Sequence, residues 1–170
     1  MFAAACLLHA ITVCRVRSFW DVAVNCFDNG EYTELATIIR NWHPAAGMVP
    51  QHFWGFPFAI TGVSKLFSIP ELMALVLISM LSSLAVCILV HRLYGGWVAA
   101  AFICINYEWI QLSVEGGAEP LFMCLLYAGF LAARLGRWNL AALLVSLSTT
   151  VRPVGVCALL VFAAVLVLLC

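Results

Sequence analysis

The sequence predicts an all-α, polytopic membrane protein, and three observations support that prediction. Of its 170 residues, 65% are hydrophobic and only 9% are charged, whereas about a quarter of a soluble domain is charged. Long apolar runs alternate with short polar breaks, as they do in a bundle of spanning helices. All eight carboxylates can be placed on one side of a membrane, and none of them follows Glu119. The net charge of zero argues against a nucleic-acid partner.

Six apolar runs have the composition of spanning helices. A span needs about 20 apolar residues, so the first run is short for a crossing, and the last is still apolar where the sequence stops at Cys170. We therefore expect a single transmembrane module, residues 1–170, from the N-terminal part of a longer protein. The predicted spans cover residues 1–14, 71–94, 96–114, 120–135, 138–151 and 154–170.

A long loop, residues 15–70, separates the first two runs. Its segment 53–69 is apolar but is interrupted by glycine, proline and lysine, so we interpret it as a helix lying in the membrane interface and not as a span. This choice sets the topology. If the segment lies flat, the loop shares one side of the membrane with Glu119 and Arg152, and if it spans, they lie on opposite sides.

Arginines indicate the orientation. Arg92, Arg134 and Arg137 fall in two short turns on one side, which the positive-inside rule makes cytoplasmic. Residues 15–70 then form a non-cytoplasmic loop, although this loop contains four basic residues of its own. The rule weakens for loops of about this length. The location expected is a bacterial plasma membrane or, in a eukaryote, the endoplasmic reticulum membrane.

Cysteines are frequent, but their spacing does not indicate a metal site or a disulfide framework. There are eight of them, most lie inside apolar runs, and no CxxC pair occurs. We interpret them as small apolar packing residues.

Asp28 begins the most informative polar stretch, Asp28 to Ala36. Asp28, Glu31 and Tyr32 are spaced i, i+3 and i+4, which puts them on one face of a short helix. An aspartate at the N-cap with a glutamate three residues later also fits a capping box. The capping and catalytic interpretations are compatible, because a capped helix end holds a carboxylate rigidly.

Further polar residues stand at the borders of the predicted spans. Glu108, Gln111 and Glu115 share one face of the run 96–114, where polar groups line a wet cavity or simply lie at the interface. Glu119 either caps the next helix or belongs to a site. Arg152 stands between two apolar runs, where it either binds a phosphate or extends to the interface. His52, in the loop, could contact a phosphate or remain solvated.

Four segments together resemble the GT-C glycosyltransferases, membrane enzymes that use polyprenyl-phosphate sugars. Residues 28–36 resemble the D-x-x-x-Y-x-x-[IL]-A signature of the first external loop. Residues 53–57 resemble the aromatic-proline segment that follows it. Residues 119–122 resemble a later [DE]-P-L-F helix start, and residues 150–155 resemble T-x-[RK]-P-x-G. The family includes GPI mannosyltransferases, protein mannosyltransferases and the bacterial aminoarabinose transferase.

The resemblance implies a GT-C-like helix bundle that moves a hexose such as mannose, with inversion, from a polyprenyl-phosphate carrier to a hydroxyl of a glycan, lipid or protein. Asp28 would be the catalytic base. The substrate-binding residues expected beside it are Glu31, Tyr32, His52, Glu115, Glu119 and Arg152. A divalent Mg²⁺ or Mn²⁺ is left open, with Asp28 and Glu119 as its candidate ligands. The family places an acid at or near the position after the loop aspartate, whereas this chain has Asn29 there.

Two other functions fit the composition. A family member without catalysis would bind the lipid carrier or a partner, and a retained Asp28 argues against it. A transporter fragment would need ionisable groups at mid-membrane depth, and Glu108 is the candidate for such a group.

Overall fold

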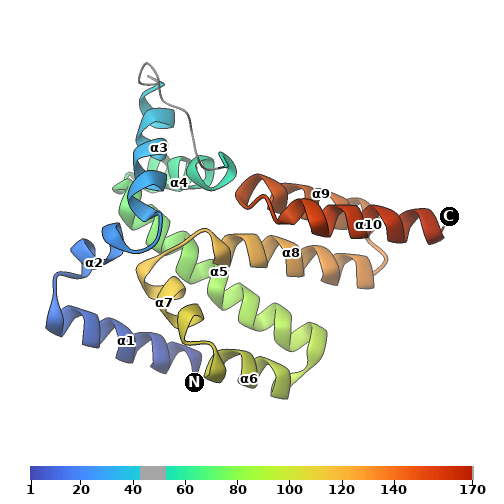
Figure 1. Ribbon diagram of the computed structural model, residues 1–170, viewed down its shortest axis with the longest axis horizontal. Helices are drawn as coiled ribbons and strands as arrows, with labels where there is room; N and C mark the ends of the chain where they lie inside the picture. Colours follow the sequence, from blue (N-terminus) through green and yellow to red (C-terminus); the bar gives the residue numbers. More distant parts are fainter. Residues whose placement is uncertain (43–52, 170) are drawn as a thin grey trace.

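The computed structural model describes residues 1–42 and 53–169, and within these ranges all regular secondary structure is helical (Figure 1). An all-α fold, as the sequence predicts, is therefore confirmed for the described residues. The helices are α1 Phe2–Val16, α2 Phe19–Asn25, α3 Asn29–Asn41, α4 Gly55–Phe67, α5 Glu71–Tyr94, α6 Gly96–Ile105, α7 Tyr107–Glu115, α8 Glu119–Arg134, α9 Trp138–Val151 and α10 Gly155–Leu169.

The bounds of α5, α8, α9 and α10 follow the sequence prediction closely. The runs predicted at 71–94 and 138–151 are α5 and α9, and Pro120 lies in the first turn of α8, where its missing N–H costs no hydrogen bond. Gly95 and Gly136 adopt positive φ at the turns that follow α5 and α8, a conformation that glycine adopts without strain.

The continuous helix predicted over residues 96–114 is wrong. The chain breaks at Asn106, and α6 and α7 meet at a bend of 77°. Asn106 has φ −96° and ψ 86°, and its side-chain oxygen accepts a hydrogen bond from the Trp109 N–H at 3.1 Å. The polar side chain thus caps a new helix inside an apolar run, in competition with helix continuation.

One described helix, α5, is long and apolar enough to cross a membrane. The pairs α1 with α2, bent by 104°, and α6 with α7 would also qualify if each pair crosses as one broken span. The predicted span at 138–151 is a helix of 14 residues, or about 21 Å. That is shorter than the hydrocarbon core of about 30 Å. The number of crossings therefore stays a prediction.

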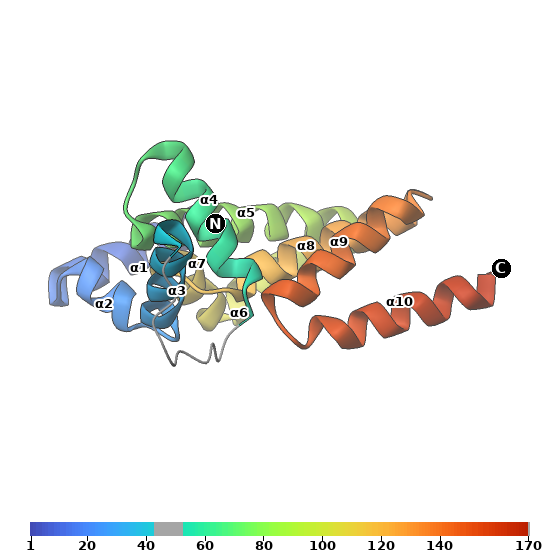
Figure 2. The same ribbon diagram turned by 90° about the horizontal axis from the view of Figure 1, so that it is seen from above.

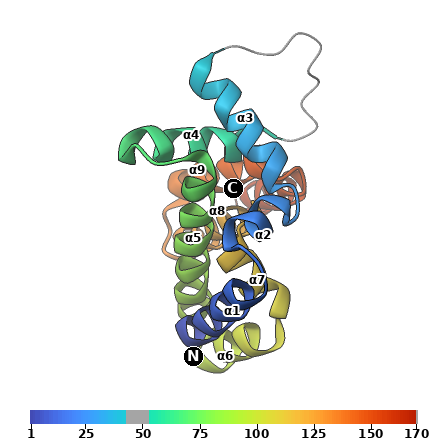
Figure 3. The ribbon, with the colours of Figure 1, turned by 90° about the vertical axis from the view of Figure 1, so that its left-hand side faces the viewer.

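Helix α4, formed by the ambiguous segment of the loop, crosses α5 at a steep angle (Figures 2 and 3). Thr61 ties it to α3 by donating to the Ala36 carbonyl at 3.0 Å. The Arg40 guanidinium joins α3 to the start of α5 through Glu71 at 2.7 Å. One core cluster unites the facing sides of α3, α4, α5, α8 and α9. Its members are Tyr32, Ala36, Phe56, Ile60, Ala74, Leu75, Ile78, Ala118, Phe122 and Val151.

Candidate functional site

The four segments that carry the family resemblance meet at one end of the helix assembly. Arg152, at the end of α9, pairs with the carboxylate of Glu119 in the first turn of α8. The α9–α10 connection lies beside the first turn of α4 (Figure 1). Segments separated by as many as 124 positions, from 28 to 152, therefore contribute to one cluster.

Tyr32 lies at the centre of this cluster. Its side chain is 2% exposed and packs edge-on against Phe56, with ring centroids 5.0 Å apart. Burial raises the pKa of Tyr32 above its usual 10.0. The Arg152 guanidinium lowers this pKa through its charge and a hydrogen bond, and the carboxylates of Asp28 and Glu31 raise it. Tyr32 is thus in electrostatic contact with a cation on one side and two acids on its own helix.

Asp28 is the N-cap residue of α3, as predicted, but the capping-box interpretation of its side chain is wrong. The Asp28 side chain makes no capping hydrogen bond at the start of α3. The carboxylate of Asp28 is half-buried, and its charge acts on Tyr32. A carboxylate placed at a helix start without engaging the backbone N–H groups keeps its lone pairs for other donors.

A close backbone approach brings α4 against α9. A Cβ built on Gly55 would lie 2.6 Å from the Thr150 carbonyl oxygen, a distance that real Cβ atoms do not adopt. Glycine is therefore required at the start of α4. Gly55 and Thr150 both belong to the motif segments. Their contact holds Phe56, the residue after Gly55, against Tyr32, and Thr150 lies two residues before Arg152.

The Arg152–Glu119 pair has unused hydrogen-bonding capacity. Arg152 Nε and Glu119 Oε2 are both buried, and neither has a hydrogen-bond partner. Buried polar atoms without partners are costly and call for an explanation. A phosphate oxygen would satisfy the guanidinium donor, and a ligand hydroxyl would satisfy the carboxylate acceptor. Among the residues that the structure describes, no group of three or more His, Cys, Asp or Glu is arranged to hold a metal ion.

Glu115 lies apart from this cluster, in a second and more deeply buried one. It is 3% exposed. Its Oε1 lies 2.8 Å from His9 Nε2, and its Oε2 accepts from the Cys26 thiol at 2.8 Å and from Gln111 Nε2 at 3.0 Å. His9 Nδ1 in turn lies 3.3 Å from the hydroxyl of Tyr107. The Glu115 carboxylate therefore faces α1 and the end of α2, whereas the Glu119 carboxylate pairs with Arg152.

Asn29 connects the two clusters. It is fully buried, and its amide donates to the carbonyls of Ala23 at 2.8 Å and Glu115 at 3.0 Å. Asn29 thereby holds the start of α3, and with it Asp28, against the end of α7. An aspartate at this position could not donate either bond.

The turn between α7 and α8 is held by Ser79 of α5. The Ser79 hydroxyl donates to the Gly117 carbonyl at 2.8 Å and accepts from the Gly117 N–H at 3.0 Å. Gly116 adopts φ +101°, which requires glycine. Ser79 is eight residues into α5, about 12 Å along its axis, so the turn that leads to Glu119 lies well below the start of that helix.

The remaining predicted residues are more peripheral. Glu31 is exposed beside Tyr32, and Glu108 is exposed on the first turn of α7. His52 lies outside the described residues. Sequence reasoning assigned no role to His9 and treated Cys26 as packing. His9 is the one histidine inside the first apolar run, and this was the available signal, but its partner is 106 positions away.

A cavity of about 500 Å³ lies elsewhere, between α8, α9 and α10. Comparison with family models, curated proteins and solved structures finds no match to this chain.

Proposed function

We propose that the chain is part of a multi-pass, GT-C-like glycosyltransferase of the membrane. It moves a hexose such as mannose from a polyprenyl-phosphate carrier to an acceptor hydroxyl, with inversion, on the non-cytoplasmic face. The observation that supports this most is the meeting of four motif segments around Tyr32, Glu119 and Arg152. Motif matches that arise by chance have no reason to lie together in space.

Orientation is part of the proposal. Arg92 lies at the end of α5, and Arg134 of α8 donates to the Leu93 carbonyl at 2.9 Å, so two of the three turn arginines lie at one end of the helix assembly. Glu119 and Arg152 pair instead at the start of α8, the opposite end of that helix from Arg134, and Asp28 joins them through Tyr32. This separation of charge supports a cytoplasmic arginine end and a non-cytoplasmic site.

Asp28 would act as the general base. It takes the proton from the acceptor hydroxyl, and the freed oxygen attacks the anomeric carbon. The bond between that carbon and the carrier phosphate breaks, and both electrons leave with the phosphate oxygen. Arg152 stabilises the charge that develops there, and its unpaired Nε supplies a donor. Asp28 and Glu119 stay the candidate ligands of a divalent metal.

The test uses the full-length protein in proteoliposomes with a membrane extract as the source of acceptors. Labelled polyprenyl-phosphate hexoses are compared with the matching nucleotide sugars. We expect transfer from the lipid-linked donors, loss of transfer in Arg152→Gln, and retention in Arg17→Gln, which changes an exposed arginine at the end of α1. Transfer from nucleotide sugars alone would contradict the proposal. Donor binding without transfer would indicate the non-catalytic family member.

The transporter is the second candidate, and the buried His9–Glu115 pair favours it. The pair joins α1 to α7, and each of these helices belongs to one of the two bent pairs. Ionisable groups next to broken helices are typical of transport sites. A proton flux into proteoliposomes that disappears in both His9→Gln and Glu115→Gln, with no sugar transfer in wild type, would select this function.

A further inference from the structure

We propose that the cavity between α8, α9 and α10 binds an anionic phospholipid of the cytoplasmic leaflet. This inference requires the proposed membrane location but not the transferase activity. The cavity measures about 500 Å³ and is lined by Phe130, Ala133, Arg134, Trp138, Cys157, Ala158, Val161, Phe162 and Val165. Its volume is within the usual range of small-ligand sites.

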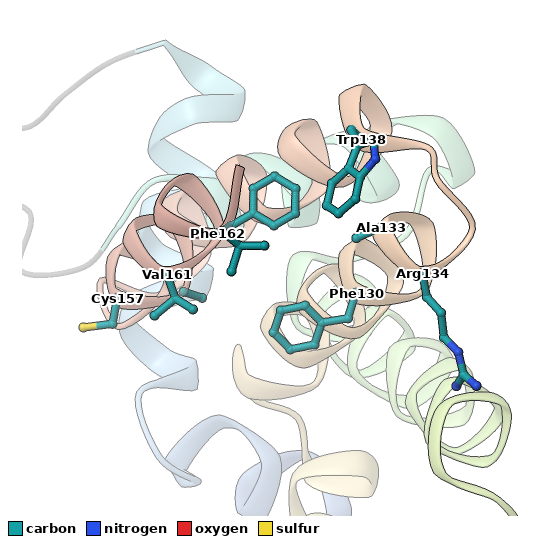
Figure 4. Close-up of a pocket in the computed structure, with 9 residues that line it drawn as sticks. Phe130, Ala133, Arg134, Trp138, Cys157, Val161 and Phe162 are labelled. Atoms are coloured by element: carbon teal, nitrogen blue, oxygen red, sulfur yellow. The ribbon is translucent and has the colours of Figure 1, made fainter. Parts of the chain in front are cut away.

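The lining fits an acyl chain. Eight of the nine side chains are apolar or sulfur-bearing, and no acidic residue is among them. Phe130 and Phe162 extend into the space from opposite sides, and Trp138 lies beside Phe162 with ring centroids 6.0 Å apart (Figure 4). Such a surface offers dispersion contacts to a lipid tail, and the indole N–H of Trp138 is a hydrogen-bond donor that suits the headgroup end of the site.

Charge identifies the headgroup. Arg134 is the one charged residue of the lining, and Arg137 follows in the same turn; both are exposed. Figure 4 shows the Arg134 guanidinium extending away from the apolar lining. One of its N–H groups donates a hydrogen bond to the Leu93 carbonyl. Its other N–H groups, together with Arg137, suit a phosphate. Basic pockets between helices at the cytoplasmic face bind anionic headgroups in this way.

The position of Trp138 is consistent with a lipid site that begins at the membrane–water interface. Tryptophan is favoured at the level of the lipid headgroups, and Trp138 opens α9 directly after Arg137. From Trp138 and Phe162 the apolar lining continues along α10 through Val161 to Cys157, towards the connection between α9 and α10 at the far end of α9. The order from outside inward is thus arginine, tryptophan and aliphatic side chains, which matches the order of phosphate, interface and tail in a phospholipid.

The experiment measures lipid bound to the purified full-length protein by native mass spectrometry, with phosphatidylglycerol and phosphatidylcholine of identical tails. We expect a preference for phosphatidylglycerol. Arg137→Gln should weaken its binding about fivefold and Arg134→Gln with Arg137→Gln about 25-fold, since each arginine near an anionic surface contributes about that factor. Arg17→Gln is the control and should bind as wild type does.

A second readout locates the lipid. Cys157 lines the cavity and is exposed, whereas Cys104 is exposed on α6. Phosphatidylglycerol should slow alkylation of Cys157 by a maleimide and leave Cys104 unchanged, and phosphatidylcholine should protect neither. Equal binding of both lipids, an unchanged Arg137→Gln, or a lipid-free dimer that protects Cys157 would overturn the proposal.

Discussion

The guanidinium of Arg152 pairs with the carboxylate of Glu119, and this ion pair joins the end of α9 to the start of α8. The pair is incomplete, because Arg152 Nε and Glu119 Oε2 are buried without partners. Leaving buried charged groups partly unsatisfied costs stability. Unpaired polar atoms of this kind are expected where a bound ligand supplies the missing hydrogen-bond partners.

Replacing Arg152 by glutamine should lower the rate of transfer from the lipid-linked sugar more than it lowers the stability of the fold. The variant keeps length and polarity but loses the charge opposite the carrier phosphate, so we expect kcat/KM for the lipid-linked sugar to fall about 10- to 100-fold. Transfer kinetics in proteoliposomes measure this. Arg152→Lys should recover part of the loss by restoring the charge without the planar fork. An unchanged kcat/KM in Arg152→Gln would remove Arg152 from the site.

Tyr32 should make stability fall at alkaline pH. Burial raises the pKa of Tyr32 above 10.0 in the folded protein, while the unfolded chain keeps the ordinary value. The unfolded state therefore loses its proton first as the pH rises, and the stability present below pH 10.0 decreases from there upward through the folded pKa. Thermal unfolding of wild type and Tyr32→Phe across this range measures the effect. Identical pH profiles would contradict it.

Asn29→Asp should destabilise the protein strongly. The substitution removes both donated bonds, to the carbonyls of Ala23 and Glu115, and turns a carboxylate towards those oxygens. We expect a loss of about 2 to 4 kcal/mol, measured by denaturant or thermal unfolding in detergent. Asn25→Asp is the matched control, because Asn25 is exposed and its side-chain amide donates to the Asp21 carbonyl of the same helix. Equal effects of the two variants would mean that Asn29 does not hold α3 to α7.

Two glycines of α4 should respond in opposite directions to alanine. Gly55→Ala places a Cβ 2.6 Å from the Thr150 carbonyl oxygen and should cost about 1 to 3 kcal/mol. Gly62 has open space around its Cβ position, so Gly62→Ala should stabilise the helix by about 0.5 to 1 kcal/mol. Unfolding free energies of the two variants give the comparison. A stabilised Gly55→Ala would show that α4 does not contact α9 closely.

The helices were predicted well from local sequence, because an apolar run and the glycine or proline that ends it are neighbours in the chain. The bounds of α5 and α9 follow from Gly95, Gly136 and the length of each apolar run. The break at Asn106 was missed since a single asparagine competes weakly with the apolar residues around it. Its effect depends on whether its side chain finds the Trp109 N–H, which composition does not reveal.

The candidate site was predicted in part. The motif segments named Asp28, Tyr32, Glu119 and Arg152, and the structure brings Tyr32, Glu119 and Arg152 into one cluster with Asp28 at its edge. Glu115 was expected among the substrate-binding residues as well. A glycine pair separates Glu115 from Glu119, and the turn sends their side chains to different neighbours. Long-range pairs such as His9 with Glu115 have no local signature.

The central claim is that Asp28 is the base of a lipid-linked sugar transfer, and the transfer rate of Asp28→Asn in the full-length protein tests it most directly. Loss of a general base should lower kcat by about 100- to 10,000-fold while donor binding persists. Glu34→Gln, an exposed acid on the same helix, should keep the wild-type rate. A near-wild-type rate in Asp28→Asn would contradict the account.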